Sequence, residues 1–414
     1  MASASAIAPE LEPSARGYRW VMLAGLWLAY LSFGLVSGGI PPLVDPVSKD
    51  LDLSPSEMGS VMGAWPLVYI FMAIPAGALI DRFGLRRSIA AGILLVSLSG
   101  ILRAVAVNHA TLYGAVAVFG LGGPFISVGA PKLISVWFNR KDRGLAMGLY
   151  LTASYSGRIL ALTTANFVLM PLYHSSWRLT FATYAGVALL AATVWWVLST
   201  DQGQSSEEAP ESGSGFAASM KVFPLLLRIP VVRIILVIVV GSFFFSHGFS
   251  NWMPKILRAG GMTDTQADFW AVLPIVVGIG AILIIPRLAK PGRRIPMLAG
   301  FFLAAGAAAS IVATTSGAPL IVGLILQGAA GVGVMPIIML TLMDAPQIGP
   351  QRMGAAGGLY FTAGEIGGVL GPLLLGIMRD LTGSFQVGLF TLTGLSVVLI
   401  SLAVRLGFAL RRQT

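Results

Sequence analysis

The sequence predicts an all-α polytopic membrane protein with twelve transmembrane helices, arranged as two six-helix bundles related by a pseudo-twofold axis. Its 414 residues are 56% hydrophobic and only 11% charged, whereas soluble domains carry about 25% charged residues. Twelve long apolar runs follow one another, and a polar segment separates the sixth run from the seventh. This composition does not suit a water-covered surface, but it suits a chain surrounded by lipid.

Each of the twelve runs comes close to the roughly 20 apolar residues that a bilayer-spanning helix needs. The first run is too long for a signal peptide, whose apolar stretch has about 7–15 residues, so we interpret it as a retained span. The predicted spans cover roughly residues 19–44, 56–80, 88–107, 110–137, 145–171, 176–199, 231–254, 268–288, 295–314, 318–343, 353–377 and 385–408.

The distribution of Lys and Arg predicts that both termini are cytoplasmic. With the N-terminus inside, 19 of the 27 basic residues fall in cytoplasmic segments, 5 fall outside and 3 lie within spans. Basic residues collect in the cytoplasmic loops of membrane proteins, so this split supports twelve spans. The net charge of +10 is therefore explained by topology, and we expect no nucleic-acid partner.

The segment TDQGQSSEEAPESGSGFAASM, residues 200–220, has the composition of a flexible linker. It divides the chain into two halves of six spans. The predicted order is a cytoplasmic tail (1–18), a six-helix bundle (19–199), a cytoplasmic linker (200–230), a second six-helix bundle (231–408) and a cytoplasmic tail (409–414).

A repeated phrase supports this division. GLYLTASYSG at 148–157 and GLYFTAGEIG at 358–367 match at six of ten positions, 210 residues apart. The offset maps the fifth run onto the eleventh, which indicates a parallel repeat of two halves. Because small residues let helices approach closely, the shared glycines predict a duplicated packing element.

The loop GALIDRFGLRRS, residues 77–88, resembles the signature loop of the major facilitator superfamily. The residues that fit are Gly77, Leu79, Asp81, Arg82, Gly84, Arg86 and Arg87. Leu85 departs from the pattern, because a basic residue is usual there. The matching loop of the second half, IIPRLAKPGRRIP, keeps the final glycine and arginines but has Ala289 in place of the aspartate. WFNRKDRGLAMG and QRMGAAGG resemble the other conserved loop of the family.

The first motif has a physical interpretation of its own. An aspartate at a helix end, beside basic neighbours, can hold cytoplasmic helix ends together in one conformation and release them in another. The resemblance implies this gating role for Asp81, Arg82 and Arg86. The alternative is that these charges only anchor the topology.

Charged side chains within spans cost at least about 2.5–3.5 kcal/mol and therefore mark interior cavities. Arg158 lies near the middle of the fifth run without a neutralising neighbour at helical spacing, so we predict contact with an anionic substrate or a buried structural pair. Glu365 lies in the middle of the eleventh run, and we predict that it carries a coupling proton. A fixed salt bridge between Arg158 and Glu365 is the alternative.

Three further polar residues are predicted to contact substrate. Histidine is the side chain whose ordinary pKa lies nearest neutral pH, so His247 is a candidate for binding substrate and for proton coupling, with hydrogen-bonded packing as the alternative. Asn251 follows one turn along the same face. Lys132 either snorkels to the cytoplasmic side or lines an inner binding path. Arg103 is expected to snorkel to the outer end of its span.

Aromatic side chains in the spans are candidates for the walls of a binding cavity, although most such residues pack or face lipid. The candidates that we assign to substrate binding are Tyr30, Trp65, Tyr360 and Phe361.

The deep charges are on balance mildly positive and favour an anionic solute. We predict a secondary active transporter that moves a small organic or inorganic anion, monocarboxylate-like, by alternating access, with H⁺ coupling or exchange. SHGFSNWMPKILRAGG and APKLISVWFNRKDRGLAMG loosely resemble the cyanate-permease and monocarboxylate-type branches of the superfamily. The alternative is a drug or metabolite exporter of the same fold, although the fifth run lacks the glycine-proline motif of the family's antiporters.

Other function classes find no support. The sequence has no G-x-x-x-x-G-K-[ST] loop for ATP drive and no nucleophile–base pair at a recognisable spacing, so we do not expect an enzyme. With no cysteine and three histidines, we expect no metal or other cofactor. The resemblance implies a monomer in the lipid bilayer of a bacterial inner membrane.

Overall fold

The computed structural model describes residues 13–139, 141–200, 223–343 and 348–411, and these ranges contain helices but no strand. The first half consists of α1 (Pro13–Gly38), α2 (Val44–Asp50), α3 (Pro55–Phe83), α4 (Leu85–Ala104), α5 (His109–Trp137), α6 (Arg143–Thr164), α7 (Met170–Leu172) and α8 (Trp177–Leu198). The 3-10 turn η1 (Pro41–Leu43) precedes α2, and the π-helical turn η2 (Ala165–Leu169) joins α6 to α7.

The second half consists of α10 (Pro230–Ala259), α11 (Asp264–Leu288), α12 (Arg294–Thr314), α13 (Ala318–Met343), α14 (Gly349–Thr382) and α15 (Gln386–Arg411), with a 3-10 turn η3 (Pro291–Arg293) before α12. The linker predicted at 200–230 falls mostly on residues 201–222, and the tails predicted at 1–18 and 409–414 fall partly on 1–12 and 412–414; these segments lie outside the described residues.

The described part of the chain contains eleven helices that are long and apolar enough to cross a membrane. They correspond to the predicted spans except the fifth. That span falls on α6, whose sequence holds Arg143, Arg158 and many glycines and hydroxylated residues. These polar residues lower the hydropathy of α6, and they also make α6 a candidate for a functional role. The count of twelve spans stays a prediction.

Local signals start and stop the helices. Ser54 and Glu57 form a capping box at the start of α3, and Thr263 and Gln266 form another at the start of α11. Such caps satisfy backbone N–H groups that have no partner within the helix. Gly84, with φ of 84°, ends α3 and permits the sharp turn into α4 because it has no Cβ atom.

The two copies of the repeated phrase pack in the same way. A Cβ atom on Gly157 of α6 would lie 2.1 Å from the carbonyl oxygen of Leu31 in α1. On Gly367 of α14, the same position of the second copy, it would lie 2.0 Å from the carbonyl oxygen of Val240 in α10. Only glycine lets the backbones approach this closely. The repeated phrase therefore holds α6 against α1 and α14 against α10.

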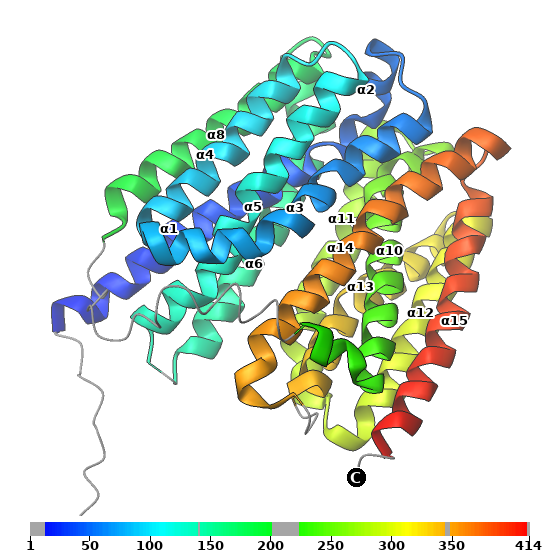
Figure 1. Ribbon diagram of the computed structural model, residues 1–414. Coiled ribbons are helices and arrows are strands. Elements are labelled where there is room, and N and C mark those ends of the chain that lie inside the picture. Colours follow the sequence, from blue (N-terminus) through cyan, green and yellow to red (C-terminus); the bar gives the residue numbers. More distant parts are fainter. Residues whose placement is uncertain (1–12, 140, 201–222, 344–347, 412–414) are drawn as a thin grey trace, which may run out of the picture.

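Figure 1 shows the helices of the first half and those of the second half as two bundles side by side. We call the end that carries α2 the distal end, and the end where α1 begins and α15 finishes the proximal end. At the distal end the halves touch closely: a Cβ atom on Gly59 of α3 would lie 2.5 Å from the carbonyl oxygen of Pro372 in α14. One on Gly376 of α14 would lie 2.3 Å from the carbonyl oxygen of Pro55.

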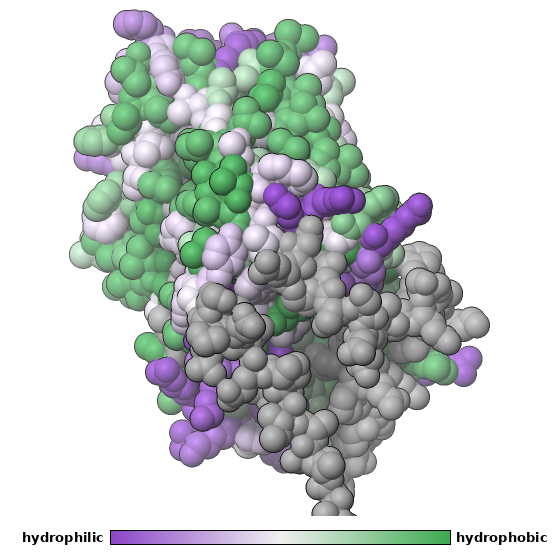
Figure 2. Space-filling model, turned by 90° about the vertical axis from the view of Figure 1, so that its left-hand side faces the viewer, coloured by the Kyte–Doolittle hydropathy of each residue, from purple (hydrophilic) through white to green (hydrophobic). Residues whose placement is uncertain are grey.

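The outer surface of the molecule is apolar over a broad area. Figure 2 shows hydrophobic side chains across much of the upper part of one face, with hydrophilic residues at the top edge and toward the bottom. Large apolar side chains such as Leu190 and Val197 of α8 and Leu94 of α4 are exposed. In water an apolar surface of this kind would promote aggregation, whereas lipid solvates it. The chain is thus a multi-pass integral membrane protein.

Candidate functional site

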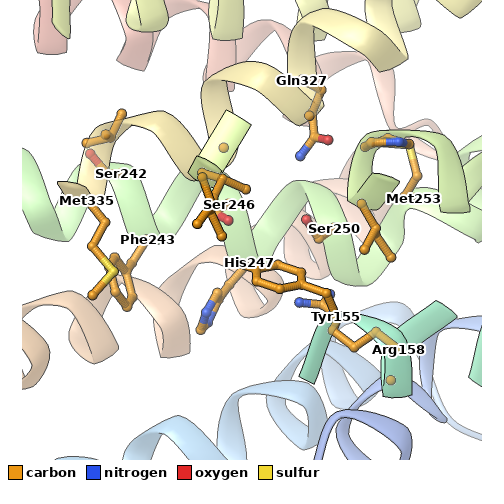
Figure 3. Close-up of a pocket in the computed structure, with 18 of the residues that line it drawn as sticks. Tyr155, Arg158, Ser242, Phe243, Ser246, His247, Ser250, Met253, Gln327 and Met335 are labelled. Atoms are coloured by element: carbon orange, nitrogen blue, oxygen red, sulfur yellow. The ribbon is translucent and has the colours of Figure 1, made fainter. Parts of the chain in front are cut away.

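A cavity of about 370 Å³ lies between the two halves. Side chains from α6 of the first half and from α10, α11, α13 and α14 of the second half line it. This volume is within the range of small-molecule binding sites, about 300–1,000 Å³. The residues that Figure 3 labels come from both halves and point toward a common space.

Arg158 enters the cavity from α6 (Figure 3). Its side chain makes no hydrogen bond or ion pair with any residue that the structure describes, so the predicted salt bridge to Glu365 is not formed in this conformation. A guanidinium carries five N–H donors and cannot lose its charge in a protein. A half-buried cation without a partner among the described residues favours the binding of an anion, and this is the strongest chemical feature of the cavity.

Two of the predicted residues come together beside the cavity. His247 Nδ1 of α10 lies 3.9 Å from Glu365 Oε2 of α14, and neither atom has a hydrogen-bond partner among the described residues. Gly368 makes room for them, because a Cβ atom there would lie 2.5 Å from His247 Nδ1 and 2.6 Å from Glu365 Oε2. The indole of Trp65, from the first half, packs on the imidazole with ring centroids 5.7 Å apart.

A polar wall of the cavity comes from residues that the sequence analysis did not assign. Ser246 and Ser250 of α10 and Gln327 of α13 line the cavity (Figure 3), and their side chains form no hydrogen bond with the described residues. Ser242 differs, because its Oγ donates to the carbonyl oxygen of Ile238 at 2.7 Å. The four-residue spacing of these serines was the available signal, since it places them on one helix face.

Of the predicted aromatic walls, Tyr360 lines the cavity. Phe361 packs edge-on against Tyr360, with ring centroids 5.3 Å apart. Tyr30 stacks on Tyr150 of α6 at 4.4 Å, and the amide of Asn251 donates to the carbonyl oxygen of His247 at 2.9 Å. Tyr30, Asn251 and Phe361 are not among the residues that line the cavity, and their contact with substrate stays a prediction.

The predicted gating residues make their contacts within the first half. Asp81 forms an ion pair with Lys132 of α5, which does not line the cavity described above. Arg86 donates from Nη2 to the carbonyl oxygen of Trp196 at 2.8 Å and lies over its ring. Arg82 lies over the ring of the neighbouring Phe83. Within the part of the chain that the structure describes, these three residues make no ion pair or hydrogen bond across the halves in this conformation.

At the distal end, by contrast, charged groups join the halves. Asp45 of α2 accepts from Lys255 Nζ at 2.8 Å and from Arg258 Nε at 2.7 Å, and both bases belong to α10. Asn166 of η2 donates to Asp268 Oδ2 of α11 at 2.7 Å, and Arg258 Nη1 lies 3.4 Å from Asp268 Oδ1. We call these five residues the distal ion-pair network. It joins the two halves at the distal end.

Arg103 corrects one expectation. It does not snorkel to the end of α4 but is fully buried, with 0% of its surface exposed. Its Nη1 donates to the carbonyl oxygen of Val36 at 2.7 Å, and its guanidinium lies over the rings of Phe119 and Phe181. The cation–π contacts and the carbonyl compensate in part for the lost water, while Nε and Nη2 have no hydrogen-bond partner among the described residues.

Comparison with known proteins agrees with the architecture. The family model of the Major Facilitator Superfamily matches residues 26–372. The hexuronate transporter of Bacillus subtilis (strain 168) is 24% identical over 411 residues, covering 93% of this chain and 92% of that protein. The quinolone resistance transporter of Acinetobacter baumannii is 23% identical and covers 84% of each chain.

A solved structure gives the same picture for the fold. The bacterial homologue of the human lysosomal transporter Spinster superposes with a TM-score of 0.74 over 98% of both chains, at 16% identity. This likeness extends to the whole chain, and the family model covers most of it. The family that the loop motifs indicated is therefore confirmed, and the chain belongs to the Major Facilitator Superfamily.

Proposed function

We propose that this protein is a secondary active transporter of a small organic anion, and that it works by alternating access in a bacterial plasma membrane. The observation that carries the proposal is Arg158, a cation in a cavity between the halves that has no acidic partner among the described residues. Relatives named for organic acids support it: besides the hexuronate transporter, a probable L-galactonate transporter of Escherichia coli is 24% identical over 83% of this chain.

The arrangement of contacts supports a rocking mechanism. The cross-half hydrogen bonds of the described residues lie at the distal end, whereas Asp81 and Lys132 pair within one half at the proximal end. Rocking the halves about the cavity would break the distal ion-pair network and bring the proximal ends together. We propose that Asp81, Arg82 and Arg86 then bind the second half and act as the proximal gate. With the predicted topology, the distal end faces the cell exterior.

We propose that Glu365 and His247 couple transport to protons. Glu365 is 5% exposed, and a carboxylate so far from water needs either a proton or a cationic partner. His247 is the nearest basic group, at 3.9 Å, and it also lines the cavity. A proton that moves between this pair and the cavity would therefore respond to an anion that binds at Arg158 on the other side of the same space.

The test of substrate binding is Arg158→Gln, which removes the charge but keeps a hydrogen-bonding side chain. The melting temperature of the purified protein is measured with and without D-glucuronate, D-gluconate and L-lactate, because a ligand that binds only the folded state stabilises it. We expect an acid of this panel to raise the melting temperature of the parent but not of the variant. Equal stabilisation of both would contradict the proposal.

The test of coupling is Glu365→Gln in proteoliposomes. If Glu365 carries the coupling proton, the variant loses uptake driven by a pH gradient but keeps exchange of labelled for unlabelled substrate, since exchange needs no net proton movement. Retention of gradient-driven uptake by Glu365→Gln would exclude this role. Coupling to another ion or obligatory exchange would then remain for Arg158-dependent transport.

Drug export is the second candidate function, because the quinolone resistance transporter is similar over most of its length. Apolar residues such as Phe243, Met335 and Met339 line part of the cavity and would suit a drug. Overexpression that raises resistance to quinolones, without acid-dependent stabilisation of the protein, would favour this candidate.

A further inference from the structure

We infer that the cavity selects polyhydroxylated acids with a single carboxylate: Arg158 of the first half binds the charge, and Ser246, Ser250 and Gln327 of the second half bind the hydroxyl groups. The inference rests on the proposed anion transport and narrows its substrate class. It separates such acids from simple fatty acids, which lack hydroxyl groups, and from dicarboxylates, which carry a second charge.

The charge count of the cavity argues for one carboxylate. Among the residues that the structure describes, Arg158 is the only Lys or Arg that lines the cavity. Lys132 is paired with Asp81 elsewhere, and the imidazole of His247 faces Glu365. A second carboxylate would therefore be desolvated without a cation and close to an acidic side chain, which is unfavourable.

The hydrogen-bonding groups of the opposite wall argue for hydroxyls. A serine hydroxyl and a carboxamide each donate and accept, as a sugar hydroxyl does. Gln327 is 4% exposed, so its amide has little water and no described side chain to satisfy it. Leaving a buried polar group unpaired is expensive, and an alkyl chain at this wall would do so. Ligand hydroxyls at Ser246, Ser250 and Gln327 would satisfy all three.

The position of the two walls links recognition to transport. Arg158 stands on α6 of the first half, and the serines and Gln327 stand on α10 and α13 of the second half (Figure 3). A ligand that fits both walls joins the halves, whereas one that fits a single wall does not. Hydroxylated acids should therefore favour closure around the cavity as well as bind more tightly.

Binding of three probes to the purified full-length protein tests the inference. D-Gluconate has one carboxylate and a hydroxylated chain, hexanoate is the analogue without hydroxyls, and D-galactarate adds a second carboxylate. We expect D-gluconate to bind at least about tenfold more tightly than either of the others, by isothermal titration calorimetry at one fixed pH. Equal binding of hexanoate, or tighter binding of galactarate, would overturn the inference but leave anion transport standing. No binding of any probe would also overturn the inference, and the melting-temperature panel with Arg158→Gln then decides separately whether anion transport stands.

Serine variants locate the effect. Ser246→Ala and Ser250→Ala should each weaken D-gluconate about tenfold and hexanoate little. Ser242→Ala is the matched control, because the hydroxyl of Ser242 already bonds to its own helix. If Ser242→Ala weakens the binding of D-gluconate as much as the other two variants do, Ser246 and Ser250 do not recognise the hydroxyl groups of the ligand. The melting temperature of each variant without ligand checks folding, and Gln327→Met provides a second test of the same wall.

Discussion

Asp45→Asn should open the distal end of the protein. Asp45 is shared by Lys255 and Arg258 across the boundary between the halves, at 2.8 and 2.7 Å. These ion pairs exist only while the distal ends are together, so they stabilise the distally closed conformation relative to the distally open one. Asparagine has nearly the same shape but no charge, and the substitution therefore weakens the contacts without leaving a cavity.

The exposure of the three side chains sets the magnitude. Asp45 is 43% exposed, whereas Lys255 and Arg258 are 21% and 10% exposed. Exposed ion pairs are worth about 0.2–1 kcal/mol each, and Arg258 keeps Asp268 at 3.4 Å after the substitution. For the two pairs together we therefore expect a loss of about 0.4–2 kcal/mol of preference for the closed conformation, a change of roughly 2–30-fold in the ratio of the two populations.

The chain contains no cysteine, which allows spin labels to be placed without altering native residues elsewhere. Val107→Cys and Ser316→Cys put one exposed label in the distal loop of each half, between α4 and α5 and between α12 and α13. Double electron–electron resonance should show longer label-to-label distances gaining population in Asp45→Asn. Arg178→Gln is the matched control, because Arg178 pairs with Asp50 inside the first half.

Two results would refute this reasoning. If Asp45→Asn leaves the distance distribution of the parent unchanged, the distal ion-pair network does not hold the halves together. If Arg178→Gln shifts the distribution as much as Asp45→Asn does, the effect belongs to distal charge in general and not to the contacts that cross the halves.

Three further predictions concern packing and the proximal end. Gly367→Ala should lower the melting temperature in detergent, because overpacking costs about 1–3 kcal/mol. Gly358→Ala is the control and should not lower it, because a Cβ atom there meets nothing within 4 Å. Equal melting temperatures of the two variants would contradict the packing role. Lys132→Ala should free Asp81 to bind the second half and shift the distal distances to longer values in the same resonance experiment; a shift to shorter values would exclude it. Arg103→Leu should keep the melting temperature within a few degrees or raise it, since replacing a buried charge by an apolar side chain is often neutral or stabilising. Loss of folded protein would show that the hydrogen bond from Arg103 to α1 is essential.

The spans could be predicted from the sequence because the physics that sets them is local. A segment in lipid must satisfy its own backbone hydrogen bonds, so a long apolar run becomes a helix whatever its neighbours are. The same reasoning found Arg158 and Glu365, since a charge in such a run is expensive and needs a reason. It was wrong for Arg103, where neighbouring helices supply rings and a carbonyl that the sequence of α4 does not contain. The fifth span, which falls on α6, stays a prediction.

The sequence by itself determined the helical class, the two halves, the repeated glycine contact and the charges that had to be explained. Only the tertiary structure decided which of those charges meet: Lys132 pairs with Asp81, and His247 faces Glu365. Arg158 lines the cavity opposite Ser246 and Gln327 and pairs with no described residue. Partners on different helices depend on how each helix is rotated and which ends of the halves are in contact. Neither quantity is encoded in the hydropathy of a single run, because the energy that fixes it comes from packing between segments that lie far apart in the chain.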